Sequence, residues 1–183
     1  MSKIILVTGG ARSGKSKFAE SLAKKLSDKA AYIATAQIFD EEMEYRVKLH
    51  KQRRDSFWTT YEAPFEADQV IMKVAETFDV ILFDCVTMYL SNYLYKDNLS
   101  DEKKIYRNAE ILIGRLIYAA KISNTTVIFV SNEVGEGIVP ENKLARIFRD
   151  VAGLANQKIA AQAEKVFLTV AGIAVDLKKI CEN

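Results

Sequence analysis

A glycine-rich stretch near the start of the chain, GGARSGKS, carries residue types that bind phosphate. The fixed positions of the pattern G-x-x-x-x-G-K-[ST] are filled by Gly9, Gly14, Lys15 and Ser16. Such a loop points backbone N–H groups at an anion, and the helix that follows adds its positive end. Lys15 can reach the β- and γ-phosphates of a nucleotide, the Ser16 hydroxyl can ligate Mg²⁺, and Arg12 and Ser13 can donate further hydrogen bonds. The alternative is a chance glycine-rich turn, but the full motif between a strand and a helix predicts a nucleoside triphosphate site.

Two acidic residues follow other apolar runs. Asp84 ends the run VILFD, where a carboxylate can hold Mg²⁺ directly or through water. Glu133 follows TTVIFVSN, and either contacts substrate or metal or lies in a structural turn. Asp84 also has a plain alternative, a strand-end aspartate in a turn.

The stretch RVKLHKQRR contains His50, the only histidine of the chain. Five cations surround it in sequence: Arg46, Lys48, Lys51, Arg53 and Arg54. Neighbouring positive charges disfavour imidazolium and keep a nucleophilic, neutral ring. Attack of imidazole on an α-phosphate would form a phosphoramidate, and the cations would stabilise the departing pyrophosphate. Two plain alternatives remain open, a half-buried histidine on the apolar face of a helix from Asp40 and a solvated charged face.

Short apolar runs alternate with helical patterns along the chain. Strands are expected at 3–8, 30–35, 57–62, 79–84 and 125–132, with a closing strand pair within 165–178. Helices are expected at 15–28, from 40 to beyond 50, at 66–77, 87–95, 101–121 and 142–165, the last one interrupted near Gly153. The first helix should bury the stripe of Phe18, Leu22 and Leu26. This alternation predicts an α/β fold, a mostly parallel sheet with helices on both faces, whose ligand lies at the carboxyl ends of the strands.

Composition limits the class of protein. The chain has 183 residues, 49% hydrophobic and 27% charged, and fits one domain over 1–183. A net charge of +2 gives no reason to expect nucleic acid as a partner. Cys85 and Cys181 suggest neither a disulfide framework nor a metal site, and no apolar stretch is long enough to span a bilayer. We therefore expect a soluble, cytoplasmic protein with reduced thiols.

The sequence resembles a known family, the bifunctional adenosylcobinamide kinase / adenosylcobinamide-phosphate guanylyltransferase of cobalamin biosynthesis. The likeness covers nearly the whole chain, and the most specific pair of segments is GGARSGKS together with NEVGEGIVP. The resemblance implies a RecA-like P-loop domain that phosphorylates adenosylcobinamide with ATP or GTP. It then implies GMP transfer from GTP through a guanylylated histidine, giving adenosylcobinamide-GDP and pyrophosphate, and a homotrimer as the assembly.

The family resemblance also implies the site residues. His50 takes the position of the guanylylated histidine, and Lys15 acts with it in catalysis. The nucleotide contacts correspond to Gly9, Gly10, Ala11, Arg12, Ser13, Gly14, Lys15, Ser16, Ala34, Thr35, Ala36, Lys51, Gln52, Arg53, Arg54, Glu62 and Asp84. Mg²⁺ would be held by Ser16 and Asp84. Leu49 stands where some relatives have a second histidine, and Asp84 where some have Glu.

Three rival functions can be distinguished. A plain small-molecule kinase with the same phosphate loop would carry no label from α-labelled GTP. A non-enzymatic nucleotide-dependent switch would hydrolyse nucleotide slowly and make no product from cobinamide. A nucleic-acid motor is disfavoured by the near-neutral charge and by the lack of a second domain.

Overall fold

The protein is described by a computed structural model, which describes residues 3–37, 55–96 and 101–181. Its strands are β1 (Lys3–Gly9), β2 (Ala30–Ala34), β3 (Trp58–Glu62), β4 (Val80–Asp84), β5 (Thr126–Asn132), β6 (Lys165–Val170) and β7 (Ile173–Asp176). Its helices are α1 (Lys15–Leu26), α3 (Ala67–Val74), α4 (Val86–Lys96), α5 (Glu102–Ile122), α6 (Lys143–Gln162) and α7 (Leu177–Ile180). The expected helix from Asp40 lies outside the described residues.

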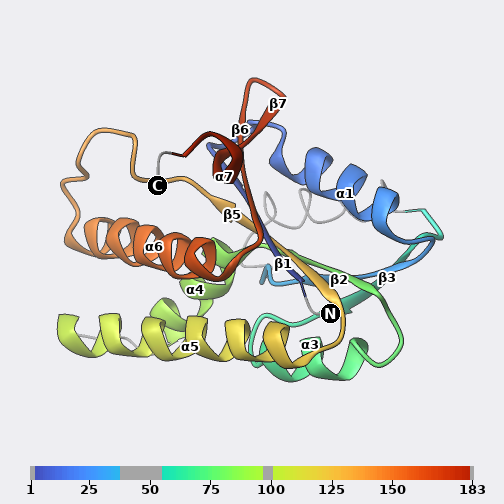
Figure 1. The fold of residues 1–183 in the computed structure, drawn as a ribbon. Helices are drawn as coiled ribbons and strands as arrows, with labels where there is room; N and C mark the ends of the chain where they lie inside the picture. The colour runs from blue at the N-terminus through green and yellow to red at the C-terminus, as the bar shows by residue number, and fades with distance from the viewer. Residues whose placement is uncertain (1–2, 38–54, 97–100, 182–183) are drawn as a thin grey trace.

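The seven strands form one sheet in the order β3-β2-β4-β5-β1-β6-β7. All neighbours are parallel except β6 and β7, which pair antiparallel as the expected closing pair. Helix α1 covers one face of the sheet, and α3, α4, α5 and α6 lie on the other (Figure 1). The predicted mostly parallel α/β sheet with helices on both faces is confirmed.

Burial alternates along the central strands. In β1, Ile4 and Leu6 pack in the cluster under α5 and α6, whereas Ile5 and Val7 pack under α1. The strands are continuous apolar runs because both of their faces are covered. Their carboxyl ends therefore meet at one edge, and Gly9 and Asp84 both lie there.

One expectation about the helices was wrong, and another was confirmed only in part. Helix α6 runs through Gly153 without a break. A helical glycine costs about 1 kcal/mol relative to alanine, and the buried residues on both sides of it, such as Val151 and Ile159, outweigh that cost. Of the stripe expected on α1, Phe18 and Leu22 pack against the cluster under the helix, but Leu26 is 47% exposed. The most buried positions of α1 are Lys15, Ala19 and Ala23, because the helix turns its small residues towards the sheet.

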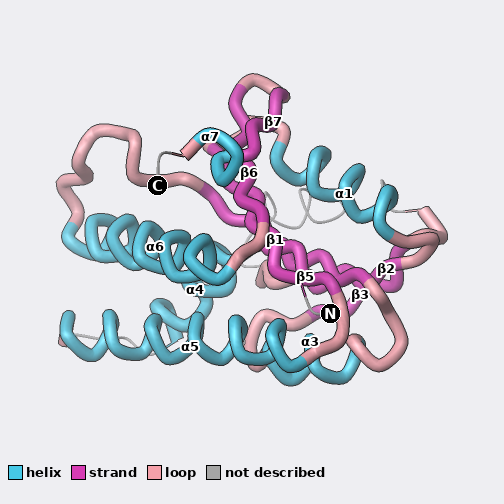
Figure 2. The backbone as a smooth tube through the Cα atoms, in the orientation of Figure 1, coloured by secondary structure: helices cyan, strands magenta, loops and turns pink. Residues whose placement is uncertain are grey.

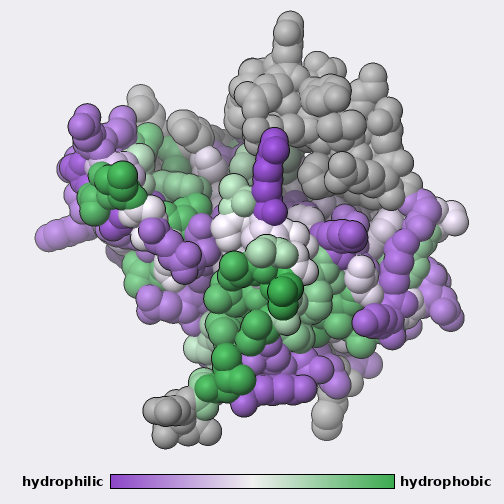
Figure 3. Space-filling model, turned by 90° about the horizontal axis from the view of Figure 1, so that it is seen from above, coloured by the Kyte–Doolittle hydropathy of each residue, from purple (hydrophilic) through white to green (hydrophobic). Residues whose placement is uncertain are grey.

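The β6–β7 hairpin stands next to the beginning of α1 (Figure 2). Figure 3 looks down on this end of the molecule and shows an apolar area in the middle of the face. Val170, Ile173 and Val175 are the hairpin's exposed apolar side chains.

Among the helices in the described ranges, none combines the length and apolarity that crossing a bilayer would require.

Candidate nucleotide site

The loop between β1 and α1 has the tight course expected of a phosphate loop. Gly14 has φ 97°, a left-handed conformation that favours glycine. A Cβ atom at Gly9 would lie 2.4 Å from the carbonyl oxygen of Thr169, so only glycine fits against the hairpin. Within the loop the Ser13 N–H donates to the Gly10 carbonyl over 3.2 Å. The motif thus folds as a compact loop at the amino end of α1, where N–H groups can cradle an anion.

Lys15 is the first residue of α1, and its side chain lies back along the loop. Its Nζ donates to the Gly10 carbonyl over 3.1 Å. Burial lowers the pKa of Lys15, and the neighbouring Cys85 and Asp84 act in the opposite direction. The ammonium group therefore sits in a partly desolvated position between the loop and the end of β4, where its attraction for phosphate is strengthened.

Asp84 is the last residue of β4, and it pairs in register with Ala34 of β2 and Val130 of β5. The Tyr32 hydroxyl donates to Asp84 Oδ2 over 2.8 Å. The structure therefore brings Lys15 and Asp84 to the same edge of the sheet, as the sequence predicted. Ser16 follows Lys15 in the first turn of α1 and is half-buried.

The residues after β2 lie beside Asp84. The Thr35 hydroxyl is fully buried, donates to the Cys85 carbonyl over 2.9 Å and accepts from the Cys85 N–H over 2.8 Å. Burial raises the pKa of the Cys85 thiol to about 11. Ala34 and Ala36 are half-exposed next to this turn. The Thr35 side chain thus holds the main chain of Cys85, the residue that follows Asp84.

The remaining predicted residues differ in their placement. Glu62 ends β3, pairs in register with Ala34, and is exposed. Glu133 accepts from the Gly135 N–H over 2.8 Å, and its own N–H donates to the Gly9 carbonyl over 3.0 Å. These bonds give Glu133 a structural role in the turn after β5. His50, Lys51, Gln52, Arg53 and Arg54 lie outside the described residues.

Three residues of the site could not be predicted from the sequence. The Thr169 hydroxyl on β6 donates to the Thr8 carbonyl over 3.0 Å and lies 2.9 Å from Ser13 Oγ. The Gly172 N–H in the hairpin turn donates to the Ser13 carbonyl over 2.9 Å. Tyr32 holds Asp84. No motif marks any of them, since each acts through a strand that is distant in sequence; the glycine of VAGIAV is the single hint at a tight turn.

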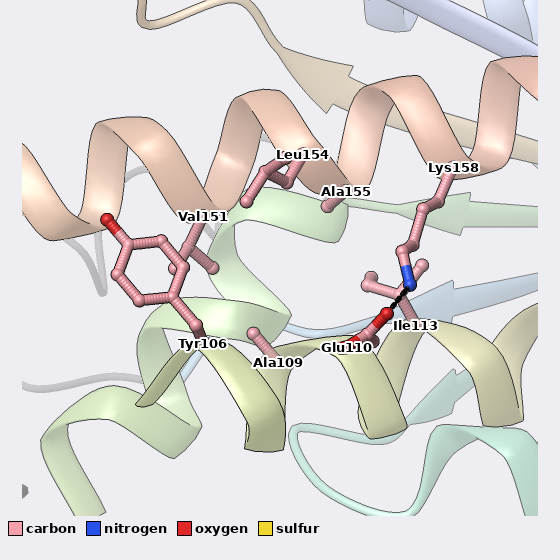
Figure 4. Close-up of a pocket in the computed structure, with 8 residues that line it drawn as sticks. All are labelled: Tyr106, Ala109, Glu110, Ile113, Val151, Leu154, Ala155 and Lys158. Atoms are coloured by element: carbon pink, nitrogen blue, oxygen red, sulfur yellow. Dashed lines mark hydrogen bonds and ion pairs between the residues drawn. The ribbon is translucent and has the colours of Figure 1, made fainter. Parts of the chain in front are cut away.

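A hollow lies between α5 and α6 on the face opposite α1 (Figure 4). It measures about 140 Å³ and has mostly apolar walls, among them Ile113, Val151 and Leu154. An ion pair between Glu110 and Lys158 crosses one end of it. An apolar hollow of this kind has too few donors for a triphosphate, so the phosphate loop remains the candidate nucleotide site.

Comparisons with known proteins identify the family of the chain. Residues 5–177 match the model of the family described as cobinamide kinase / cobinamide phosphate guanyltransferase. The chain is 44% identical over 181 residues to the bifunctional adenosylcobalamin biosynthesis protein CobU of Escherichia coli (strain K12), covering 96% of this chain and 99% of that protein. It is 40% identical over 173 residues to the bifunctional adenosylcobalamin biosynthesis protein CobP of Pseudomonas aeruginosa, covering 94% of this chain and 96% of that one.

A solved structure supports the fold. The crystal structure of the RadB recombinase superposes with a TM-score of 0.50 at 16% identity, covering 91% of this chain and 74% of that one. At this identity the likeness concerns the RecA-like P-loop fold alone. The family match covers nearly the whole chain and includes the phosphate loop and Asp84. The chain therefore belongs to the cobinamide kinase / cobinamide phosphate guanyltransferase family, a family of transferases of cobalamin biosynthesis.

Proposed function

We propose that this chain phosphorylates adenosylcobinamide with ATP or GTP, and then transfers GMP from GTP through guanylylated His50. The products of the second reaction are adenosylcobinamide-GDP and pyrophosphate. Family membership supports both reactions. The observation that carries the proposal is that the buried Lys15 and Asp84 lie near each other at the carboxyl edge of the sheet, beside the compact phosphate loop.

Both reactions require a seated triphosphate. The N–H groups from Gly10 to Ser16 and the amino end of α1 would bind its oxygens, and Lys15 would move from the Gly10 carbonyl to the phosphates. Exchanging a neutral acceptor for an anionic one strengthens the lysine's hydrogen bond. Arg53 or Arg54 would hold the opposite end of the triphosphate.

Mg²⁺ fits the oxygen donors at this edge. Tyr32 donates to Oδ2 of Asp84, so among the residues that the structure describes Oδ1 could serve as the metal ligand, and the Ser16 hydroxyl stands in the first turn of α1. Mg²⁺ is usually held by one or two carboxylates together with substrate phosphates. When bound, it would offset the negative charge on the phosphates during transfer.

The second reaction proceeds in two displacements. A ring nitrogen of His50 attacks the α-phosphorus of GTP, forming an N–P bond while the bond to the bridging oxygen breaks and pyrophosphate leaves. A phosphate oxygen of adenosylcobinamide phosphate then attacks the same phosphorus, and the N–P bond breaks to restore the imidazole. Resemblance to the family further supports a cytoplasmic homotrimer as the working assembly.

His50→Ala tests the covalent step. Wild-type protein incubated with α-labelled GTP should carry an acid-labile, base-stable label at residue 50, and the variant should carry none. GMP transfer should be abolished in the variant, because the histidine is the nucleophile, while phosphorylation from γ-labelled nucleotide persists. Normal amounts of adenosylcobinamide-GDP from His50→Ala would show that His50 is not the nucleophile and that the covalent step is wrong.

A further inference from the structure

Asp84 is held by a buried tyrosine that no motif identifies. Tyr32 is 2% exposed, and its ring packs edge-to-face against Trp58 with 5.5 Å between ring centroids. Its hydroxyl donates to Asp84 Oδ2 over 2.8 Å. A tyrosine packed in this way has few alternative rotamers, so its hydroxyl fixes the orientation of the carboxylate.

The main chain of Asp84 is fixed from the same strand end. The Thr35 N–H donates to the Asp84 carbonyl over 3.2 Å, and the Thr35 hydroxyl bonds both the N–H and the carbonyl of Cys85. Asn92 of α4 secures Thr35 in turn, donating to its carbonyl over 2.7 Å and to the Pro64 carbonyl over 3.0 Å. The side chain of Asp84 is thus held by Tyr32 in the middle of β2, and its backbone by Thr35 just after that strand.

This arrangement matters because Asp84 and Lys15 attract each other. The Asp84 charge acts on Lys15, yet the lysine donates to the Gly10 carbonyl while the carboxylate accepts from Tyr32. A carboxylate without that donor would be free to rotate and pair with the ammonium group. Such a pair would remove one ligand from the metal and one cation from the phosphates.

We propose that Tyr32 and Thr35 are positioning residues, which keep Asp84 directed at the metal and apart from Lys15. The inference rests on the proposed metal role of Asp84. Residues that orient a metal ligand typically contribute about 10- to 100-fold to metal affinity. Removal of the tyrosine hydroxyl should therefore weaken the effect of Mg²⁺ on nucleotide binding while leaving the fold intact.

The test measures binding by calorimetry with a GTP analogue that carries a methylene group at each bridging position, so that neither reaction occurs. The quantity of interest is the factor by which Mg²⁺ tightens the analogue relative to EDTA. Tyr32→Phe should reduce that factor about tenfold. Binding in EDTA should also weaken, because the released Asp84 can pair with Lys15, and the loss of one buried hydrogen bond should lower the melting temperature without unfolding the protein. Tyr106→Phe is the matched control, since Tyr106 donates to Asp150 over 3.2 Å on the α5–α6 side, and it should change nothing.

A second pair of variants tests the backbone clamp. Thr35→Val should lower the Mg²⁺ factor and Thr35→Ser should restore it, because serine keeps the hydroxyl. Thr125→Val is the control, a buried threonine whose hydroxyl donates to the Phe78 carbonyl over 2.8 Å at the opposite edge of the sheet. It should lose stability without changing the factor.

Asp84→Asn separates the two proposals. If it leaves the Mg²⁺ factor at the wild-type value, the proposed metal role of Asp84 is wrong, and the positioning role with it. If Asp84→Asn lowers the factor but both Tyr32→Phe and Thr35→Val keep the wild-type value, only the positioning role is overturned. If the Mg²⁺ factor falls in all three variants and stays at the wild-type value in the two controls, the positioning role is supported.

Discussion

Lys15 is placed for binding at a cost to the folded state. It is 9% exposed, and burial lowers the pKa of its ammonium group from the ordinary value of 10.5. A lowered pKa in the folded state means that the charged form is less favourable there than in the unfolded chain. The resulting loss of stability is fully present below the folded-state pKa and disappears as the pH rises towards 10.5.

Lys15→Met should therefore separate stability from binding. Near neutral pH the variant should melt at the wild-type temperature or above it, because a partly desolvated charge has been replaced by an apolar chain of similar length. Nucleotide binding should weaken about tenfold to a hundredfold, the usual worth of a hydrogen bond to a charged group. Calorimetric melting and nucleotide titration measure the two effects.

The difference in melting temperature between Lys15→Met and the wild type should also depend on pH. The advantage in melting temperature of Lys15→Met over the wild type should shrink as the pH is raised towards 10.5. The control is Lys17→Met, an exposed position on the same helix, whose difference from the wild type should not follow that trend. A Lys15→Met protein clearly less stable than Lys17→Met at neutral pH would contradict the cost assigned to the buried charge.

Residue types and spacing were sufficient to predict where the phosphate loop and Asp84 lie in the fold, because both are local patterns at strand ends. They were insufficient for Tyr32. In sequence Tyr32 reads as one more core aromatic of an apolar strand, and its hydroxyl gains a role only because β2 pairs with β4 so that Ala34 lies opposite Asp84. Strand order is a property of the whole sheet, and no local motif encodes it.

At the scale of elements, the β6–β7 hairpin supports the phosphate loop. The Thr169 hydroxyl bridges the Thr8 carbonyl and Ser13 Oγ, and the turn N–H of Gly172 donates to the Ser13 carbonyl. The chain end was predicted as a strand pair, yet its contact with a loop about 160 positions earlier in sequence could not be read from periodicity. The same limit explains α1, whose buried face depends on how the helix rolls against the sheet.

Thr169→Val should loosen the loop. The change keeps the shape of the side chain but removes two buried hydrogen bonds, which should cost about 1–3 kcal/mol in the free energy of unfolding. The nucleotide KM should rise, because the N–H groups around Ser13 are no longer held in place. Urea unfolding and steady-state kinetics measure the two quantities. Thr125→Val should lose comparable stability with an unchanged KM, and a Thr169→Val enzyme that behaved the same way would show that the hairpin serves the fold alone.

At the scale of the molecule, the parallel sheet follows from its strands. Apolar residues on both faces of β1, β4 and β5 require helices on both sides, and that requirement was visible in sequence. The sheet then gathers Gly9, Asp84 and Asn132 at one edge, although they are far apart in the chain. The pattern G-x-x-x-x-G-K-[ST] occurs once in the sequence. The two proposed reactions, phosphorylation and GMP transfer, would therefore use the same phosphate loop.

One loop serving two reactions makes a kinetic prediction. The GTP analogue with methylene groups at both bridging positions should compete with ATP in the phosphorylation of adenosylcobinamide, and with GTP in GMP transfer, at the same inhibition constant. The reason is that each reaction needs its nucleotide phosphates in the loop from Gly9 to Ser16, and the loop holds one triphosphate at a time. Steady-state inhibition of the two reactions, followed with γ-labelled ATP and with α-labelled GTP, measures both constants. Strong inhibition of GMP transfer with no effect on phosphorylation would require a second nucleotide site, and the two reactions would then have to be assigned to separate pockets.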